Sequence, residues 1–145
     1  MGKLSEHKFQ WPTTIESMHP RILIVDDDDA SATIARLFLK QHGYLIDVAT
    51  HLRQALRLLS HHQYHLIFLD IRLRYAEEGL HLLKTLRALP EYAQIPIVAF
   101  TAYAYVNAKE FFLEHGFDAY LEKPFSRKQI LQTAQRLLAS RWCVN

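Results

Sequence analysis

The sequence lacks the features that would place it in several broad classes of protein. It holds one cysteine among 145 residues, Cys143, so an internal disulfide is excluded and a reducing compartment is expected. No stretch approaches the roughly 18 consecutive apolar residues of a membrane-spanning helix. The N-terminus also lacks the apolar core of a signal peptide. We therefore expect a cytoplasmic protein that does not insert into a membrane.

An excess of charge of one sign is also missing. Lys and Arg number 17 against 15 Asp and Glu, which gives a formal net charge of +2. The basic residues are scattered along the sequence rather than gathered in one stripe, so we expect no nucleic-acid partner. Half of the residues are hydrophobic and 22% are charged, which is ordinary for a globular protein, and the length suits one domain.

What the sequence does hold is a run of four aspartates, residues 26–29, directly after the apolar run 21–25. A continuous apolar run is typical of a strand buried in a parallel sheet. Carboxylates crowded at the end of such a strand repel one another by about 4 kcal/mol per close pair, for an effective dielectric near 20. A second apolar run, 66–69, leads into Asp70. Two strands that bring carboxylates to one edge of a sheet predict a site for a hard divalent cation.

Strand and helix patterns alternate from Arg21 onward, which predicts a parallel sheet covered by helices. The first helix is expected to turn Ile34, Leu37 and Phe38 inward, and Gly79 to open the third helix as a flexible joint. Short connections and right-handed crossovers favour an α/β fold, a doubly wound five-stranded sheet in the order 2-1-3-4-5 with five helices. The expected strands are 21–26, 44–49, 65–70, 95–100 and 117–121, and the expected helices are 29–42, 51–62, 79–89, 104–115 and 126–139.

These elements divide the chain into three parts. Residues 1–20 show no clear periodicity and are interpreted as an N-terminal extension. Residues 21–140 form the domain, and residues 141–145 a C-terminal tail. Because few residues follow the last helix, we expect a stand-alone domain without a DNA-binding or catalytic output domain.

Ligands of an open parallel sheet bind beyond the carboxyl ends of its strands. Five polar side chains are expected there: Asp26, Asp27, Asp70, Thr101 and Lys123. Carboxylates, a hydroxyl and an ammonium group together would suit a phosphoryl group bound beside Mg²⁺, because phosphoryl transfer needs mainly positioning and neutralised charge. Asp70, at the tip of a central strand, is the best-placed nucleophile for an aspartyl phosphate.

Over about residues 20 to 140 the chain resembles the receiver domains of two-component response regulators. Four segments, in order and at compatible spacing, carry the resemblance: Ile-Leu-Ile-Val-Asp-Asp-Asp (22–28), Leu-Ile-Phe-Leu-Asp (66–70), Ile-Val-Ala-Phe-Thr-Ala (97–102) and Tyr-Leu-Glu-Lys-Pro-Phe (120–125). The resemblance implies a flavodoxin-like fold and a Mg²⁺-dependent phosphoacceptor in His-Asp signalling. It also implies that the protein is no enzyme toward other substrates and catalyses only its own phosphorylation and dephosphorylation.

The resemblance assigns the acidic residues to a metal site. It implies that Asp26 and Asp27 form the pocket for Mg²⁺ together with Asp70. Asp70 is also implied to accept the phosphoryl group from a histidine kinase or a histidine phosphotransfer protein. The backbone carbonyl of Arg72 would be a further metal ligand.

Other positions are implied to hold the phosphoryl group and to transmit its presence. Thr101 and Lys123 would contact the phosphoryl oxygens, and the Lys123–Pro124 bond would be cis. Tyr120 would be an aromatic switch that moves with Thr101 and remodels the face formed by the fourth helix, fifth strand and fifth helix. A downstream protein partner would bind that face. The resemblance also allows a homodimer.

The loop after the phosphoacceptor departs from the family pattern. Family members usually carry a proline four residues after this aspartate, where the chain has Arg74, and the Glu-Gly pair at 78–79 comes one residue later than the usual Asp-Gly. We therefore expect an altered path for this loop. Arg72 and Tyr103 flank the expected phosphate position, and our hypothesis is that they shield the acyl phosphate from water and lengthen its lifetime.

Three other functions compete with this interpretation. An aspartate-nucleophile phosphohydrolase wants a second acid two residues after the nucleophile, where the chain has Arg72. A flavin-binding module of similar topology would need a hydroxyl- and glycine-rich loop where residues 26–29 are all aspartate. A degenerate receiver that acts as a phosphate-independent adaptor is disfavoured because all five site residues are present.

Overall fold

The structure of the protein, a computed structural model, describes residues 19–71, 78–102 and 107–142, with side chains as far as residue 139. The strands are β1 (Arg21–Val25), β2 (Leu45–Ala49), β3 (Leu66–Leu69), β4 (Ile97–Thr101) and β5 (Ala119–Glu122). The helices are α2 (Asp29–Gln41), α3 (Leu52–His61), α4 (Glu78–Ala88), α5 (Ala108–Glu114) and α6 (Arg127–Trp142). Within these described ranges, no helix is both long enough and apolar enough to cross a bilayer.

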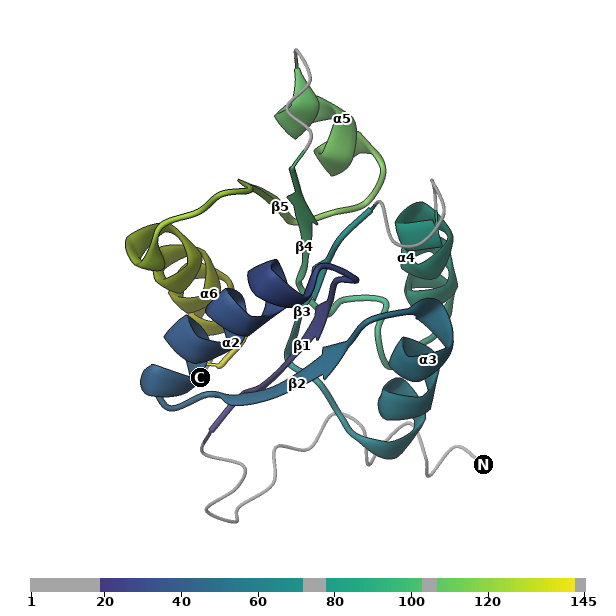
Figure 1. The fold of residues 1–145 in the computed structure, drawn as a ribbon. Helices are drawn as coiled ribbons and strands as arrows, with labels where there is room; N and C mark the ends of the chain where they lie inside the picture. Colours follow the sequence, from purple (N-terminus) through teal and green to yellow (C-terminus); the bar gives the residue numbers. More distant parts are fainter. Residues whose placement is uncertain (1–18, 72–77, 103–106, 143–145) are drawn as a thin grey trace.

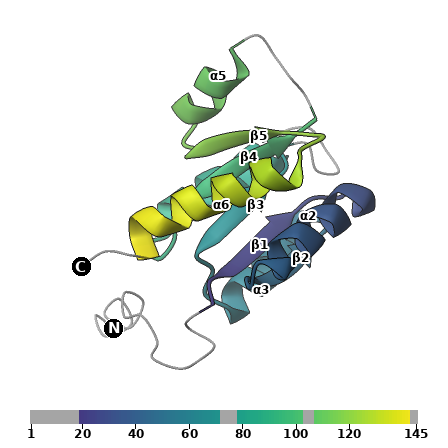
Figure 2. The ribbon, with the colours of Figure 1, turned by 90° about the vertical axis from the view of Figure 1, so that its left-hand side faces the viewer.

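The five strands form one parallel sheet in the order β2-β1-β3-β4-β5, which confirms the predicted fold and strand order. Helices α2 and α6 cover one face of the sheet, while α3, α4 and α5 cover the other (Figure 1). From the side, α2 and α6 lie next to each other in front of the strands (Figure 2). The sheet is therefore buried on both faces along its centre.

The core consists of two clusters, one on each face of the sheet. On β1, Leu23 and Val25 pack into the cluster under α3, α4 and α5, whereas Ile22 and Ile24 pack into the cluster under α2 and α6. Successive side chains of a strand point to opposite faces, so a strand buried on both faces needs apolar residues at every position. This is the physical reason for the continuous apolar runs.

The predicted inner face of α2 is wrong for two of its three residues. The residues that face the core include Ala32 and Ala35, while Ile34 is 45% and Leu37 is 52% exposed. Phe38 is partly buried and packs on the core as expected. Small alanines let the helix approach the sheet closely, so this helix buries Ala32 and Ala35 together with Leu39 and leaves Ile34 and Leu37 exposed to solvent.

Candidate functional site

The register of the sheet brings the predicted site residues to one edge. Val25 pairs with Leu69, so Asp26 and Asp70 follow side by side, and the Asp70 N–H donates to the Val25 carbonyl at 2.9 Å. On the other side of β3, the Lys123 N–H donates to the Thr101 carbonyl at 2.8 Å, where β4 and β5 end. The carboxyl ends of four strands therefore meet at one point.

Three carboxylates gather at this point. One carboxylate oxygen from each of Asp26, Asp27 and Asp70 lies within 4.8 Å of the other two. Asp26 is fully buried and Asp70 is 6% exposed, whereas Asp27 is exposed. Two buried acids and one exposed acid form a pocket of concentrated negative charge with one side open to solvent.

Lys123 supplies the positive charge in this pocket. Its Nζ lies 2.7 Å from Asp26 Oδ2, 3.2 Å from Asp70 Oδ2 and 4.8 Å from the centre of the Phe100 ring. Burial alone would lower the pKa of Lys123, but its contacts with Asp26 and then Asp70 outweigh burial, so the net pKa is raised. Lys123 is therefore a fixed cation between two buried carboxylates. The supporting ring of Phe100 was not predicted, although it directly precedes Thr101 in the sequence.

The buried carboxylate of Asp26 still has capacity for a metal ion. Its Oδ1 accepts the Asp28 backbone N–H at 3.0 Å. Its Oδ2 is buried and lies 2.7 Å from Lys123 Nζ, its ion-pair partner among the described residues. Hard cations such as Mg²⁺ take carboxylate oxygens as ligands. The three clustered carboxylates therefore form a donor set that fits a divalent cation.

Thr101 and Tyr120 lie on the same side of the sheet. Thr101 is fully buried at the end of β4. On β5, Tyr120 pairs with Ala99, which lies two residues before Thr101 on β4. Residues two apart on a strand point to the same face, so Ala99, Thr101 and Tyr120 share one face of the sheet. The Tyr120 ring is half-buried and stacks on Phe112 of α5, with ring centres 5.2 Å apart and planes at 30°. Tyr120 therefore connects the neighbourhood of Thr101 to α5.

Gly79 has a different role from the flexible joint that the sequence suggested. A Cβ atom at this position would lie 2.5 Å from the Asp70 carbonyl oxygen and 2.4 Å from the Ile71 Cα. The Gly79 N–H also donates to the Ile71 carbonyl at 3.3 Å. Gly79 therefore allows α4 to press directly against the backbone that carries Asp70. Its place just after Glu78, in the Glu-Gly pair, was the only signal in the sequence.

Two predicted site positions fall outside the residues that the structure describes. They are Arg72, predicted to offer a backbone carbonyl to the metal, and Tyr103, predicted to shield the phosphate. The Lys123–Pro124 bond is cis, as predicted.

Comparison with known proteins identifies the family of this fold and site. The family model for the response regulator receiver domain matches residues 22–135. The chain belongs to this receiver family. It is therefore a receiver of two-component signalling, a family of phosphoacceptor domains that bind Mg²⁺ in an acidic pocket.

Individual relatives agree with this assignment. The chain is 31% identical to an uncharacterised 14.6 kDa protein of Leptolyngbya boryana, over 79% of this chain and 87% of that protein. It is 35% identical to protein PetR of Rhodobacter capsulatus, over 82% of this chain but only 48% of PetR. The chain thus spans about half the length of PetR.

A solved structure of a receiver domain shares the fold. It is the receiver domain of the sensor histidine kinase PA1611 of Pseudomonas aeruginosa, which is described with a magnesium ion coordinated in its active-site cleft. The match has a TM-score of 0.74 and 30% identity, and it covers 83% of this chain and 98% of that domain. The magnesium ion belongs to that protein.

Proposed function

We propose that this receiver, residues 21–140, is a working phosphoacceptor: in the presence of Mg²⁺ it takes a phosphoryl group onto Asp70. The observation that carries the proposal is the cluster of Asp26, Asp27 and Asp70 with Lys123 Nζ between two of the carboxylates. A degenerate receiver has no need for buried like charges, which cost stability unless a cation compensates them.

Each residue of the cluster has one task in this proposal. Asp26, Asp27 and one oxygen of Asp70 hold Mg²⁺, with the Arg72 carbonyl as the further ligand that the sequence suggests. When bound, the ion neutralises charge on the carboxylates and on the phosphoryl oxygens. Lys123 stays charged at neutral pH and pairs with a phosphoryl oxygen, and the Thr101 hydroxyl donates a hydrogen bond to another.

The reaction is a single displacement at phosphorus. A carboxylate oxygen of Asp70 forms a bond to phosphorus while the phosphorus–nitrogen bond of a phosphohistidine donor breaks, and the leaving imidazole takes up a proton. The donor is a histidine kinase or a histidine phosphotransfer protein. The protein catalyses only its own phosphorylation and dephosphorylation, and Arg72 and Tyr103 slow the hydrolysis by shielding the acyl phosphate.

The output is a change of the face formed by α5, β5 and α6. The hydrogen bond to the phosphoryl group draws the Thr101 side chain toward it, and this movement changes the space beside β5. The Tyr120 ring then moves inward. Its stacking contact with Phe112 makes α5 the element that responds with it. A downstream protein then binds the changed face.

Intact-mass measurement tests the proposal. Incubation with acetyl phosphate and Mg²⁺ should add one phosphoryl group to the wild-type protein and none to Asp70→Asn. The Asp118→Asn variant, which alters an acid far along the sheet near the start of β4, should be modified like the wild type. A wild-type protein that gains no phosphoryl group, or an Asp70→Asn protein that still gains one, would contradict the proposal.

A further inference from the structure

The edge strand β2 leaves backbone groups available on its outer side. Leu45 donates its N–H to the Pro20 carbonyl at 3.0 Å, and the Ala49 carbonyl accepts the Asp26 N–H at 2.9 Å, so these residues face β1. Alternate residues of a strand direct their backbone groups to opposite sides. Ile46 and Val48 therefore turn their N–H and C=O groups away from β1, toward the outer edge of the described sheet.

This edge lacks the usual protection against pairing with another strand. Natural edge strands are commonly blunted by lysine, proline or bulges, whereas β2 reads Leu-Ile-Asp-Val-Ala and pairs in a regular register with β1. Its one charge, Asp47, is held by the Arg21 guanidinium at 2.9 Å and by the Tyr64 hydroxyl at 2.7 Å. No other strand among the described residues pairs with the outer side of β2, so a further strand can add there.

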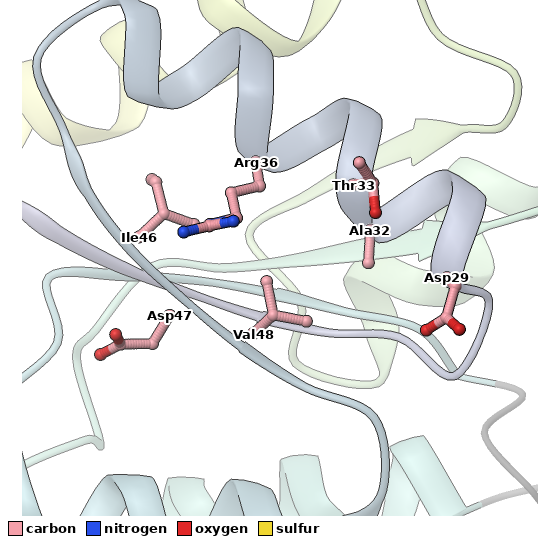
Figure 3. Close-up of a pocket in the computed structure, with 7 residues that line it drawn as sticks. All are labelled: Asp29, Ala32, Thr33, Arg36, Ile46, Asp47 and Val48. Atoms are coloured by element: carbon pink, nitrogen blue, oxygen red, sulfur yellow. The ribbon is translucent and has the colours of Figure 1, made fainter.

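A groove of about 310 Å³ runs along the edge between β2 and α2. Ile46 and Val48 project into it from the strand, and Thr33 and Arg36 line it from the helix (Figure 3). Asp29 lies at its other end, beyond Val48 (Figure 3). The groove thus offers two apolar side chains, Ile46 and Val48, beside backbone groups that can pair, which is the combination that strand addition uses.

Arg36 determines which occupant fits. The ion pairs among the described residues involve Arg21, Arg87 and Lys123, and none of them includes Arg36. A guanidinium in a groove is best matched by a carboxylate. A second copy of β2 would not supply one, because its only acid, Asp47, is engaged by Arg21 and Tyr64.

We propose that the β2 edge binds an extended segment of a partner protein as a sixth strand, with an acidic side chain of that segment against Arg36. Apolar side chains on either side of the acid pack on Ile46 and Val48. This surface is separate from the face of α5, β5 and α6, so a phosphorylated and an unphosphorylated receiver can both use it.

A matched pair of peptides tests the charge requirement. The blocked peptides Val-Thr-Glu-Thr-Val and Val-Thr-Lys-Thr-Val, labelled with a fluorophore, are titrated with the full chain and followed by anisotropy. The Glu peptide should bind more tightly than the Lys peptide, and Arg36→Glu should weaken the Glu peptide by about fivefold and favour the Lys peptide. Arg53→Glu, on α3, is the control of equal charge change and should leave both affinities unchanged.

Amide hydrogen exchange tests the strand pairing without a variant. The Ile46 and Val48 amides should exchange faster than those of Leu45 and Ala49 in the free protein, and should become protected when the Glu peptide is added. Val48→Pro removes an outward N–H without removing a hydrogen bond to β1 and should abolish binding, whereas Val48→Thr should retain it. Absence of binding at millimolar peptide, or binding without protection of these two amides, would overturn the proposal. A dimer of the chain that Val48→Pro dissociates would assign the edge to self-association and would also overturn it.

Discussion

Lys123 lies closer to Asp26 than to Asp70: its Nζ is 2.7 Å from the first carboxylate and 3.2 Å from the second. Asp26 is the more deeply buried of the two. Without a metal ion, the ammonium group is thus the main compensation for the buried charge of Asp26. The pocket that the family uses for a cation and a phosphoryl group is therefore also a place where stability and function are coupled.

Replacing this cation should destabilise the metal-free protein. Lys123→Gln leaves Asp26 and Asp70 adjacent and uncompensated, so we expect a loss of about 3 kcal/mol in the free energy of unfolding in EDTA. The loss should be smaller with Mg²⁺, which supplies the missing charge. Urea denaturation measures both values, and Lys128→Gln, at an exposed position of α6, is the control. Equal losses in the two variants would contradict the role of Lys123.

The same pair of proteins carries a signature at alkaline pH. The pKa of Lys123 is raised in the folded state, so its contribution to stability is present below the unfolded pKa near 10.5 and is lost as pH rises through the folded value. The wild type should therefore lose this contribution above about pH 10.5. Lys123→Gln should lack this component of the loss of stability.

Removing the exposed acid should separate metal binding from stability. Asp27→Ala reduces repulsion within the carboxylate cluster, so the metal-free protein should unfold at a higher temperature than the wild type. Mg²⁺ affinity should fall by about tenfold, and the rise of Tm with Mg²⁺ should shrink accordingly. Asp28→Ala, which removes the neighbouring exposed acid outside the cluster, should keep the wild-type response to Mg²⁺. Similar thermal shifts in Asp27→Ala and the wild type would argue against the metal site.

Gly79 should be intolerant of even one methyl group. The Cβ of Gly79→Ala would lie 2.5 Å from the Asp70 carbonyl oxygen, so α4 or the Asp70 backbone must move. We expect a loss of about 1–3 kcal/mol in stability, and a slower reaction with acetyl phosphate because Asp70 is displaced. Lys84→Ala, on the exposed side of the same helix, should change neither. Wild-type phosphorylation in Gly79→Ala would show that the close approach does not position Asp70.

His65 should make the protein sensitive to acid. Burial lowers the pKa of His65 to about 4, and its Nδ1 accepts the Arg21 backbone N–H at 2.9 Å. As the pH falls, His65 is therefore protonated in the unfolded state before it is protonated in the folded state. The free energy of unfolding decreases as the pH falls from about 6.5 toward 4. We expect this residue to account for a loss on the order of 1–2 kcal/mol between pH 7 and 4.5, after allowance for partial exposure. His65→Asn keeps an acceptor without the titration, so its stability curve should be flatter; parallel curves would refute the assignment.

The convergence of the site could be predicted because it follows from strand ends. Continuous apolar runs marked the buried strands, and parallel topology requires their carboxyl ends to share one edge. Asp26, Asp70, Thr101 and Lys123 each come within two residues of such an end, so their meeting did not depend on any side-chain detail.

Packing distances could not be predicted in the same way. The sequence of α2 is compatible with two different inward-facing stripes of residues. Side-chain size alone favoured the stripe with Ile34 and Leu37 over the one with Ala32 and Ala35. Close approach of the helix to the sheet, however, requires the small residues. Gly79 was ambiguous for a related reason. A flexible joint and a close backbone contact both select a residue without a Cβ, and only the distances to Asp70 and Ile71 separate them.

The most direct test of the account is chemical mapping of the phosphorylated residue. After reaction with acetyl phosphate and Mg²⁺, borohydride reduces an aspartyl phosphate to homoserine, and peptide mass mapping locates the converted residue. We predict conversion at Asp70, and none when Mg²⁺ is replaced by EDTA. Conversion at Asp26 or Asp27 instead, or equal conversion without Mg²⁺, would contradict the claim that these residues form a metal site around a single phosphoacceptor.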